Sequence, residues 1–153
     1  NEILIAALEK IKSYLDYGAF TPIQVAAASA LSSDPSTIER VRGVYRKRRD
    51  VLVDAMGKAG WNIPSPEATM FAWAPIPEKF RPLGSLEFSK VLLKEADISV
   101  APGIGFGEYG ENFVRIGLVE NEHRIRQAAR NIKSVFNRAD KILSEYSLDQ
   151  INV

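Results

Sequence analysis

A helical pattern runs without a break from Asp34 to Gly60, and it constrains the fold more than any other feature of the sequence. Asp34 suits the N-cap, Pro35 suits the first turn, and Gly60 suits the C-terminal stop. The apolar positions recur with a period near 3.6, at Ile38, Val41, Val44, Tyr45, Val51, Leu52, Ala55 and Met56. About six turns is long for a compact domain. We therefore expect a helix that connects two parts of the structure.

Two shorter helices are expected before this one. Residues 2–13 repeat apolar side chains at helical spacing, and residues 21–31 follow a loop, with Thr21 as N-cap and Pro22 in the first turn. The helical pattern begins at residue 2 and no Met precedes it. We therefore expect the chain to begin inside a longer protein.

Beyond Gly60 the pattern changes to short strand-like runs separated by helices. Strands are expected at residues 61–63, 69–73, 98–101 and 113–118. Helices are expected at residues 85–96, with Ser85 as N-cap, and from Asn121 as N-cap to about 143, while residues 149–153 should fray. Helices followed by a small α/β layer make the fold class α/β.

Composition and charge exclude several classes of function. The 153 residues carry 20 Lys and Arg against 19 Asp and Glu, so a net charge of +1 offers no field for nucleic acid or anionic lipid. Cysteine is absent, which rules out disulfides and thiolate metal sites. No apolar run is long enough to span a membrane, and we expect a cytoplasmic protein.

Three motifs that resemble functional sites are better explained by structure. Residues 105–110 match G-x-G-x-x-G, but a strand is expected after them and a dinucleotide site needs a helix there. The basic run Arg46–Arg49 lies in an amphipathic helix, which favours a solvated face. His123 is the only histidine and is expected at the surface, and the scattered carboxylates predict no metal site.

Arg115 is the residue most suited to bind a ligand. Side chains alternate across a strand, so Arg115 lies on the opposite face from Val114 and Ile116. Its planar guanidinium matches a carboxylate with two hydrogen bonds and keeps its charge. A structural ion pair with Glu108 or Glu111 is the alternative that spacing alone favours.

Two adjoining segments resemble a known family. Residues 98–107 read ISVAPGIGFG and residues 112–118 read NFVRIGL. Together they resemble the signature near the C-terminus of class I/II aminotransferases of fold type I. In that family the arginine of the second segment holds the α-carboxylate of the substrate, which implies this role for Arg115. The likeness extends to residues 12–18 and 21–24, and residues 45–50 and 68–77 look most like the glutamate-pyruvate, alanine-forming branch.

The resemblance implies the C-terminal part of a transferase fold that uses pyridoxal phosphate. Residues 1–33 would end the large cofactor-binding domain, residues 34–58 would form the connecting helix, and residues 59–153 would form the small α/β domain. The substrates would be amino acids and 2-oxo acids, and the parent protein would be a cytoplasmic homodimer of amino-acid metabolism, active in alanine biosynthesis.

Further residues gain expected roles from the same resemblance. Tyr17, Phe20 and Thr21 would contact the site of a partner subunit, although a simple turn is equally expected there. Phe71 would face the substrate cleft. Gly103 and Gly105 would shape the loop that closes over it.

The lysine that carries pyridoxal phosphate in this family is not found in the sequence. Family members hold it in an element of the form S-K-x-x-x-x-(G)-x-R, whose lysine forms the Schiff base with the cofactor. The only Ser-Lys pair here, Ser89-Lys90, lacks the rest of that element. We therefore expect no catalytic residue in this chain, which alone would be inactive.

Two other readings stay open at this stage. One is a relative of the same fold with another specificity, such as an aspartate or diaminopimelate aminotransferase or a carbon-sulfur lyase. The other is a non-catalytic module of this fold that serves as an effector domain or for dimerisation.

Overall fold

The computed structural model describes residues 1–149, with side chains described to residue 146. The chain forms two compact units, residues 1–39 and 40–153, and each is considered by itself. The expected fraying of residues 150–153 lies outside the described residues. The division into residues 1–33, 34–58 and 59–153 remains a prediction.

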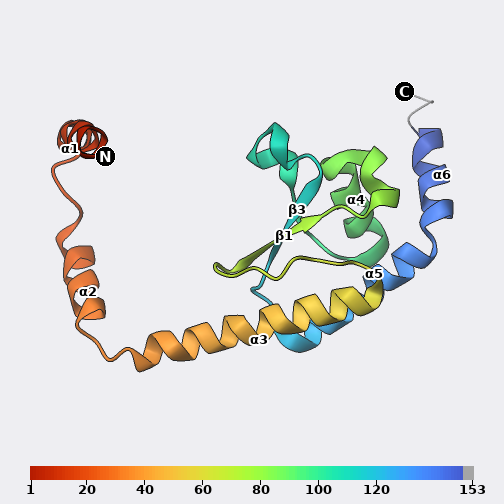
Figure 1. Cartoon of the computed structure of the whole chain (residues 1–153), viewed down its shortest axis with the longest axis horizontal. Helices are drawn as coiled ribbons and strands as arrows, with labels where there is room; N and C mark the ends of the chain where they lie inside the picture. Colours follow the sequence, from red (N-terminus) through yellow and green to blue (C-terminus); the bar gives the residue numbers. More distant parts are fainter. Residues whose placement is uncertain (150–153) are drawn as a thin grey trace. The chain divides into compact units, whose positions relative to one another are not determined.

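The first unit consists of helices, as expected. It contains α1 (Glu2–Leu15), α2 (Thr21–Leu31) and the start of α3 (Ser36–Ala59), all labelled in Figure 1. The side-chain oxygen of Asp34 accepts the Ser36 N–H at 3.0 Å, which supports Asp34 as the cap of α3. The prediction for Thr21 is wrong, because α2 already includes Thr21 and Phe20 occupies the N-cap without a side-chain hydrogen bond.

The helices α1 and α2 contain no buried residue. Large apolar side chains on them are exposed: Ile3 is 80% exposed and Leu8 64%. Within this unit the apolar positions at helical spacing therefore have no core to cover.

The second unit is mixed α/β. After α3 its elements are β1 (Phe71–Pro75), η1 (Glu78–Leu83), α4 (Gly84–Ala96), β2 (Ala101–Pro102), η2 (Gly103–Phe106), η3 (Glu108–Gly110), β3 (Phe113–Gly117), α5 (Glu122–Asn137) and α6 (Ala139–Asp149). The last predicted helix is thus two helices that meet at Arg138, and Asn121 caps the first of them by accepting the N–H groups of His123 and Arg124. The predicted strand 98–101 is reduced to β2, which begins at Ala101.

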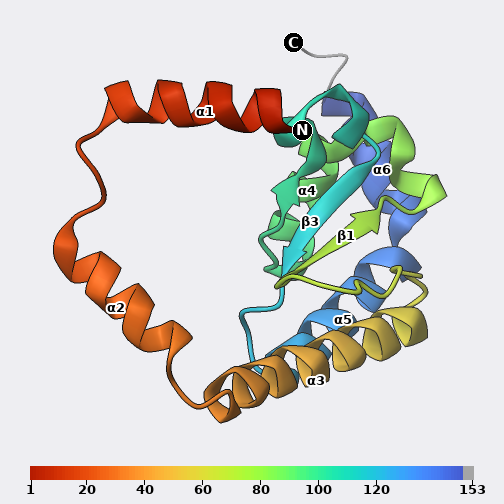
Figure 2. The same ribbon diagram turned by 60° about the vertical axis from the view of Figure 1, so that its left-hand side comes forward.

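Three antiparallel strands form the sheet in the order β1-β3-β2 (Figure 2). Arg115 on the central strand lies opposite Trp73 of β1 and opposite Ala101 of β2. Side chains that alternate along these strands therefore divide between an inner face and an outer face.

The inner face of the sheet packs on the hydrophobic core. Ala72, Ala74 and Val114 are 0% exposed, and helices α4 and α5 contribute Phe88 and Ile132 to the same core. The predicted strand at residues 61–63 does not form. The Trp61 side chain is buried all the same, and its indole N–H donates to the carbonyl of Pro75 at 2.8 Å.

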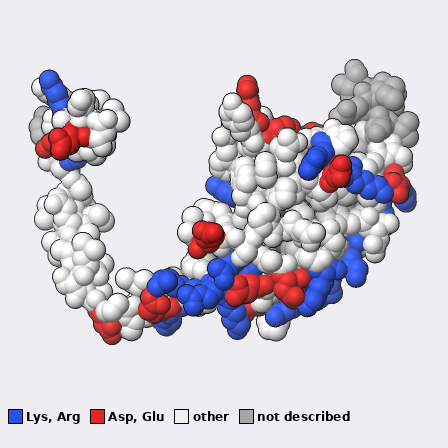
Figure 3. Space-filling model, viewed as in Figure 1, with Lys and Arg blue, Asp and Glu red and all other residues white. Residues whose placement is uncertain are grey.

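Helix α3 is tied to the end of β3 by Arg48. One guanidinium nitrogen, Nη1, donates to the carbonyls of Leu118 and Val119, both at 3.0 Å. The prediction of a solvated basic face is therefore wrong for half-buried Arg48, and it is right for exposed Arg46 and Lys47. Figure 3 shows Lys and Arg gathered along α3, with Asp and Glu among them.

Candidate functional site

The outer face of the sheet carries Arg115 among aromatic side chains. Phe71 and Trp73 of β1 share this face with Phe113 and Arg115 of β3, because the register pairs Phe71 with Gly117 and Trp73 with Arg115. Arg115 is half-buried and Trp73 is 39% exposed. The structure thus brings Arg115 and Phe71, both singled out from the sequence, onto one surface.

Two phenylalanine rings stack on the Arg115 guanidinium. Its central carbon Cζ lies 4.3 Å from the ring centroid of Phe71 and 4.6 Å from that of Phe106. Trp73 meets the Phe106 ring edge to face at 5.6 Å and stacks on Phe113 at 5.5 Å. Such stacking holds the plane of the guanidinium and removes water from part of it.

Among the residues that the structure describes, none pairs a carboxylate with Arg115. The ion pair that spacing favoured does not form: both oxygens of Glu111 accept hydrogen bonds from Ser85, and Glu108 is exposed. A cation that is stacked, partly shielded from water and free of an acidic neighbour attracts an external carboxylate strongly. This geometry suits the binding of an anion with two oxygens.

The loop beside Arg115 is closed by two glycines. A Cβ on Gly103 would lie 1.9 Å from the carbonyl oxygen of Gly110, and one on Gly110 would lie 2.1 Å from that of Gly103. Gly105 stands in open space, so the structure gives it no comparable need for glycine. The strand β3 follows this loop, which agrees with the rejection of a dinucleotide-binding motif.

Tyr17, Phe20 and Thr21 belong to the first unit, where all three are exposed. Asp16 orders the turn before them by accepting the Gly18 N–H at 2.8 Å and pairing with Lys12 at 2.9 Å. These contacts, that with Lys12 first, lower the pKa of Asp16 below its ordinary value. The role of Tyr17, Phe20 and Thr21 toward a partner subunit remains a prediction.

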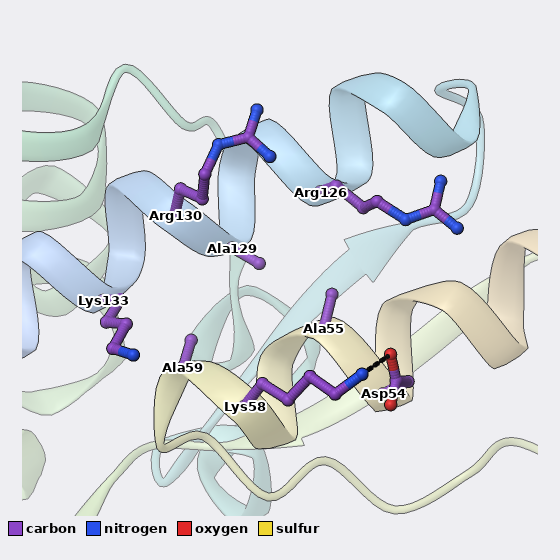
Figure 4. Close-up of a pocket in the computed structure, with 8 residues that line it drawn as sticks. All are labelled: Asp54, Ala55, Lys58, Ala59, Arg126, Ala129, Arg130 and Lys133. Carbon is purple, nitrogen blue, oxygen red and sulfur yellow. Dashed lines mark hydrogen bonds and ion pairs between the residues drawn. The ribbon is translucent and has the colours of Figure 1, made fainter.

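A separate hollow of about 270 Å³ lies between α3 and α5 (Figure 4). Ala55, Ala59 and Ala129 form part of its wall, and Lys58 at its edge is paired with Asp54 at 2.8 Å. The remaining lining side chains are exposed cations: Arg126, Arg130 and Lys133. Because exposed cations on long side chains bind anions weakly, Arg115 is the stronger candidate for a binding group.

The residues that the structure describes contain neither a membrane-spanning helix nor a cluster of metal ligands. None of the helices in residues 1–149 combines the length and apolarity that a membrane crossing requires. Within the same part of the chain, no three His, Asp or Glu side chains gather closely enough to hold a metal ion. His123 is exposed, as expected.

The class of protein follows from three features: the small sheet, the long helix α3, and Arg115 within the signature at residues 98–107 and 112–118. A model of the aminotransferase class I and II family matches residues 1–132, and the chain belongs to this family.

Within this family, the chain is most informatively compared with three individual proteins. The chain is 67% identical over 143 residues to the putative aminotransferase AatC of Rhizobium meliloti (strain 1021), covering 94% of this chain and 35% of AatC. It is 53% identical over 143 residues to the glutamate-pyruvate aminotransferase AlaC of Escherichia coli (strain K12), covering 94% of this chain and 34% of AlaC. The substrate-bound structure of BacF from Bacillus subtilis superposes with a TM-score of 0.76 at 34% identity, over 88% of this chain and 34% of BacF. The chain thus spans about a third of the length of the curated relatives it matches.

Members of this family use pyridoxal phosphate, but the residues described here do not fit that group by themselves. Every lysine of the chain is exposed. Lys90 of the single Ser-Lys pair binds Glu87 at 2.6 Å on the surface of α4. A Schiff-base lysine needs a closed pocket that lowers its pKa and aligns the cofactor. No step of the reaction is therefore assigned to lysines of this chain.

Sequence reasoning missed three residues of the site: Trp73, Phe106 and Ser85. The signal for Trp73 was present, since it lies two residues after Phe71 and therefore on the same face of the strand. Phe106 lies in the signature at residues 98–107 and Ser85 was expected to cap a helix, but neither pattern predicted the contact that each side chain makes. Phe106 reaches Arg115 from a loop, and Ser85 contacts Glu111, which lies 26 residues away in sequence.

Proposed function

We propose that this chain is the C-terminal part of an aminotransferase that moves an amino group between an amino acid and a 2-oxo acid. The observation that carries the proposal is Arg115, a stacked guanidinium without an acidic partner among the described residues. Every amino acid and 2-oxo acid has a carboxylate beside the reacting carbon. A fixed guanidinium binds that group through two charge-assisted hydrogen bonds.

The substrate pair that we propose is glutamate and pyruvate. Glutamate would lose its amino group to become 2-oxoglutarate, and pyruvate would gain it to become alanine. The support is the 53% identity to a protein named glutamate-pyruvate aminotransferase. Side-chain specificity depends largely on residues outside this chain, so aspartate and diaminopimelate are the competing donors for a substrate profile.

The intact protein would act as a cytoplasmic homodimer, with Tyr17, Phe20 and Thr21 directed to the site of the partner subunit. The support for both proposals is the family membership of residues 1–132. A photo-cross-linking residue in place of Tyr17 would test the second, because a side chain near the partner's site gives a covalent dimer and one in a simple surface turn does not.

The test of the main proposal is Arg115→Lys in the full-length protein. An ammonium keeps the charge but loses the planar fork, so binding of glutamate should weaken by about 1–3 kcal/mol. Arg124→Lys is the matched control, because Arg124 is an exposed arginine on α5. Unchanged glutamate binding in Arg115→Lys, measured from KM and by calorimetry, would disprove the carboxylate role.

A further inference from the structure

The N-terminal end of α4 is closed by a carboxylate from a distant part of the chain. One oxygen of Glu111, Oε1, accepts the Ser85 N–H at 3.1 Å, and the other, Oε2, accepts the Ser85 hydroxyl at 2.8 Å. Ser85 is 0% exposed. A negative charge at a helix N-terminus satisfies free N–H groups there and is favoured by the helix dipole. Glu111 therefore performs the capping that the sequence assigned to Ser85.

The Ser85 hydroxyl has a second hydrogen-bond partner, which plays no part in capping the helix. Its oxygen accepts the N–H of Ile104 at 3.0 Å. The hydroxyl thus donates to Glu111 and accepts from Ile104, and a hydroxyl that donates to a carboxylate becomes a stronger acceptor. The hydrogen bond from Ile104 to Ser85 therefore joins the start of the loop at residues 103–110 to the N-terminal end of α4.

This loop has little freedom between its two ends. Gly103 and Gly110 are in backbone contact, so the loop leaves and returns at one place. Within it, the Gly107 N–H donates to the carbonyl of Ile104 at 3.0 Å. Phe106 lies two residues after Ile104, and its ring is one of the two that stack on Arg115. The place of Ile104 therefore decides where the Phe106 ring lies.

We propose that Ser85 and Glu111 are positioning residues that seat Phe106 on Arg115 and thereby set the affinity of Arg115 for a substrate carboxylate. The proposal rests on the proposed function of Arg115. Neither residue touches the substrate. Their effect passes from Glu111 through the Ser85 hydroxyl to Ile104, and from Ile104 along the loop to Phe106.

The test compares Ser85→Ala, Phe106→Leu and the double variant in the full-length protein. Ser85→Ala removes the hydroxyl and its bonds to Glu111 and Ile104, and Phe106→Leu removes the ring. Each should raise KM for the amino-acid substrate by about threefold to tenfold with little change in kcat. The double variant should be no worse than Phe106→Leu alone, because both changes act on one interaction.

Ser89→Ala is the matched control. Ser89 is another buried serine on α4, one turn further on, and among the described residues its hydroxyl bonds only to the carbonyl of Ser85. It should leave KM unchanged. Hydrogen exchange of residues 103–110, followed by mass spectrometry, gives a readout apart from activity: exchange should be faster in Ser85→Ala and unchanged in Ser89→Ala.

Two results would overturn the proposal. One is that the KM factors of Ser85→Ala and Phe106→Leu multiply in the double variant, and the other is that exchange of residues 103–110 is unchanged in Ser85→Ala. If Ser85→Ala does not fold, Glu111→Gln serves instead. It keeps a neutral partner for Ser85, and its KM factor should likewise not multiply with that of Phe106→Leu. Failure of the proposed function is seen separately, as unchanged glutamate binding in Arg115→Lys.

Discussion

The two faces of the small sheet differ in how far their side chains are buried and paired. On the inner face Ala72, Ala74 and Val114 are 0% exposed, and the core covers every side chain they present. On the outer face Trp73 is 39% exposed, and Arg115 has stacked rings but no carboxylate partner among the residues that the structure describes. Alternation along the same strands thus gives one face to the core and leaves the other for the binding that we propose.

The outer face also has a cost in folding free energy. Partly removing water from a guanidinium is unfavourable unless another charge or a stack of rings compensates it. The rings of Phe71 and Phe106 compensate it in part. In the site that we propose, a bound carboxylate would complete this compensation.

The largest expected effect lies in the core behind the inner face. Phe88 is 0% exposed and its ring contacts those of Trp61 and Phe80. Phe88→Ala should lower the free energy of unfolding by about 3–5 kcal/mol, because it removes a buried ring and leaves a cavity. Urea unfolding followed by circular dichroism measures this. Phe106→Ala on the outer face, where the ring is 53% exposed, should lower it by about 1 kcal/mol or less; equal losses would break the distinction between the faces.

The next effect concerns the loop that borders the outer face. Gly103→Ala places a methyl group against the carbonyl of Gly110, so the loop must shift and stability should fall by about 1–3 kcal/mol. Gly105→Ala is the control, since a Cβ there meets nothing within 4 Å and its effect should stay within about 0.5 kcal/mol. Similar losses at the two glycines would show that the backbone contact is unimportant.

A smaller effect on stability is expected at Arg115 itself. Arg115→Met removes the charge and keeps most of the apolar chain, so the free energy of unfolding should fall by about 1 kcal/mol or less. Arg48→Met is the comparison, because Arg48 donates to two backbone carbonyls and its loss should cost about 1–3 kcal/mol. If thermal unfolding gave Arg115 the larger loss, its charge would be structural and the outer face would not be a binding face.

The smallest effect concerns the first unit and serves as a baseline. The Ser36 N–H, and then its hydroxyl, lower the pKa of Asp34 below the ordinary value of 3.8. A lowered pKa in the folded state means that the ionised cap stabilises α3 above that value and that this contribution is lost as the pH falls through the lowered pKa. Circular dichroism should show a slight loss of helix at low pH that Asp34→Ala does not show. Identical acid profiles for the two proteins would contradict the cap.

Local signals in the sequence predicted two helix caps for which the deciding contact is local, although the same kind of signal failed at Thr21. Asp34 and Asn121 were expected to cap helices, and each accepts an N–H two residues ahead. Ser85 was expected to be a cap for the same reason, but the cap comes from Glu111, which only the folded loop brings near. The strand expected at residues 61–63 does not form, because an apolar run indicates burial but not a strand partner. Trp61 is buried, and its indole N–H donates to the carbonyl of Pro75 outside any strand pairing of residues 61–63.

The sequence predicted Arg115 and Phe71 of the candidate site and missed the other side chains around them. Strand alternation placed Arg115 opposite the aliphatic face, and the register confirms that placement. Spacing alone favoured an ion pair with Glu108 or Glu111, and it was wrong because spacing does not show that Glu111 is already occupied by Ser85. The stack with Phe106 depends on the path of a glycine-closed loop, which no periodicity describes.

The hydrogen bonds from Arg48 join the long helix to the chain just beyond β3. Arg48 holds the carbonyls of Leu118 and Val119, only three and four residues beyond Arg115 on the same chain. The last turns of α3 also bury Leu52 and Met56 in the core under the sheet. Helix α3 is therefore joined to the chain close to Arg115 by both hydrogen bonds and core packing. In the site that we propose, this junction helps to fix the position from which the guanidinium would hold a carboxylate.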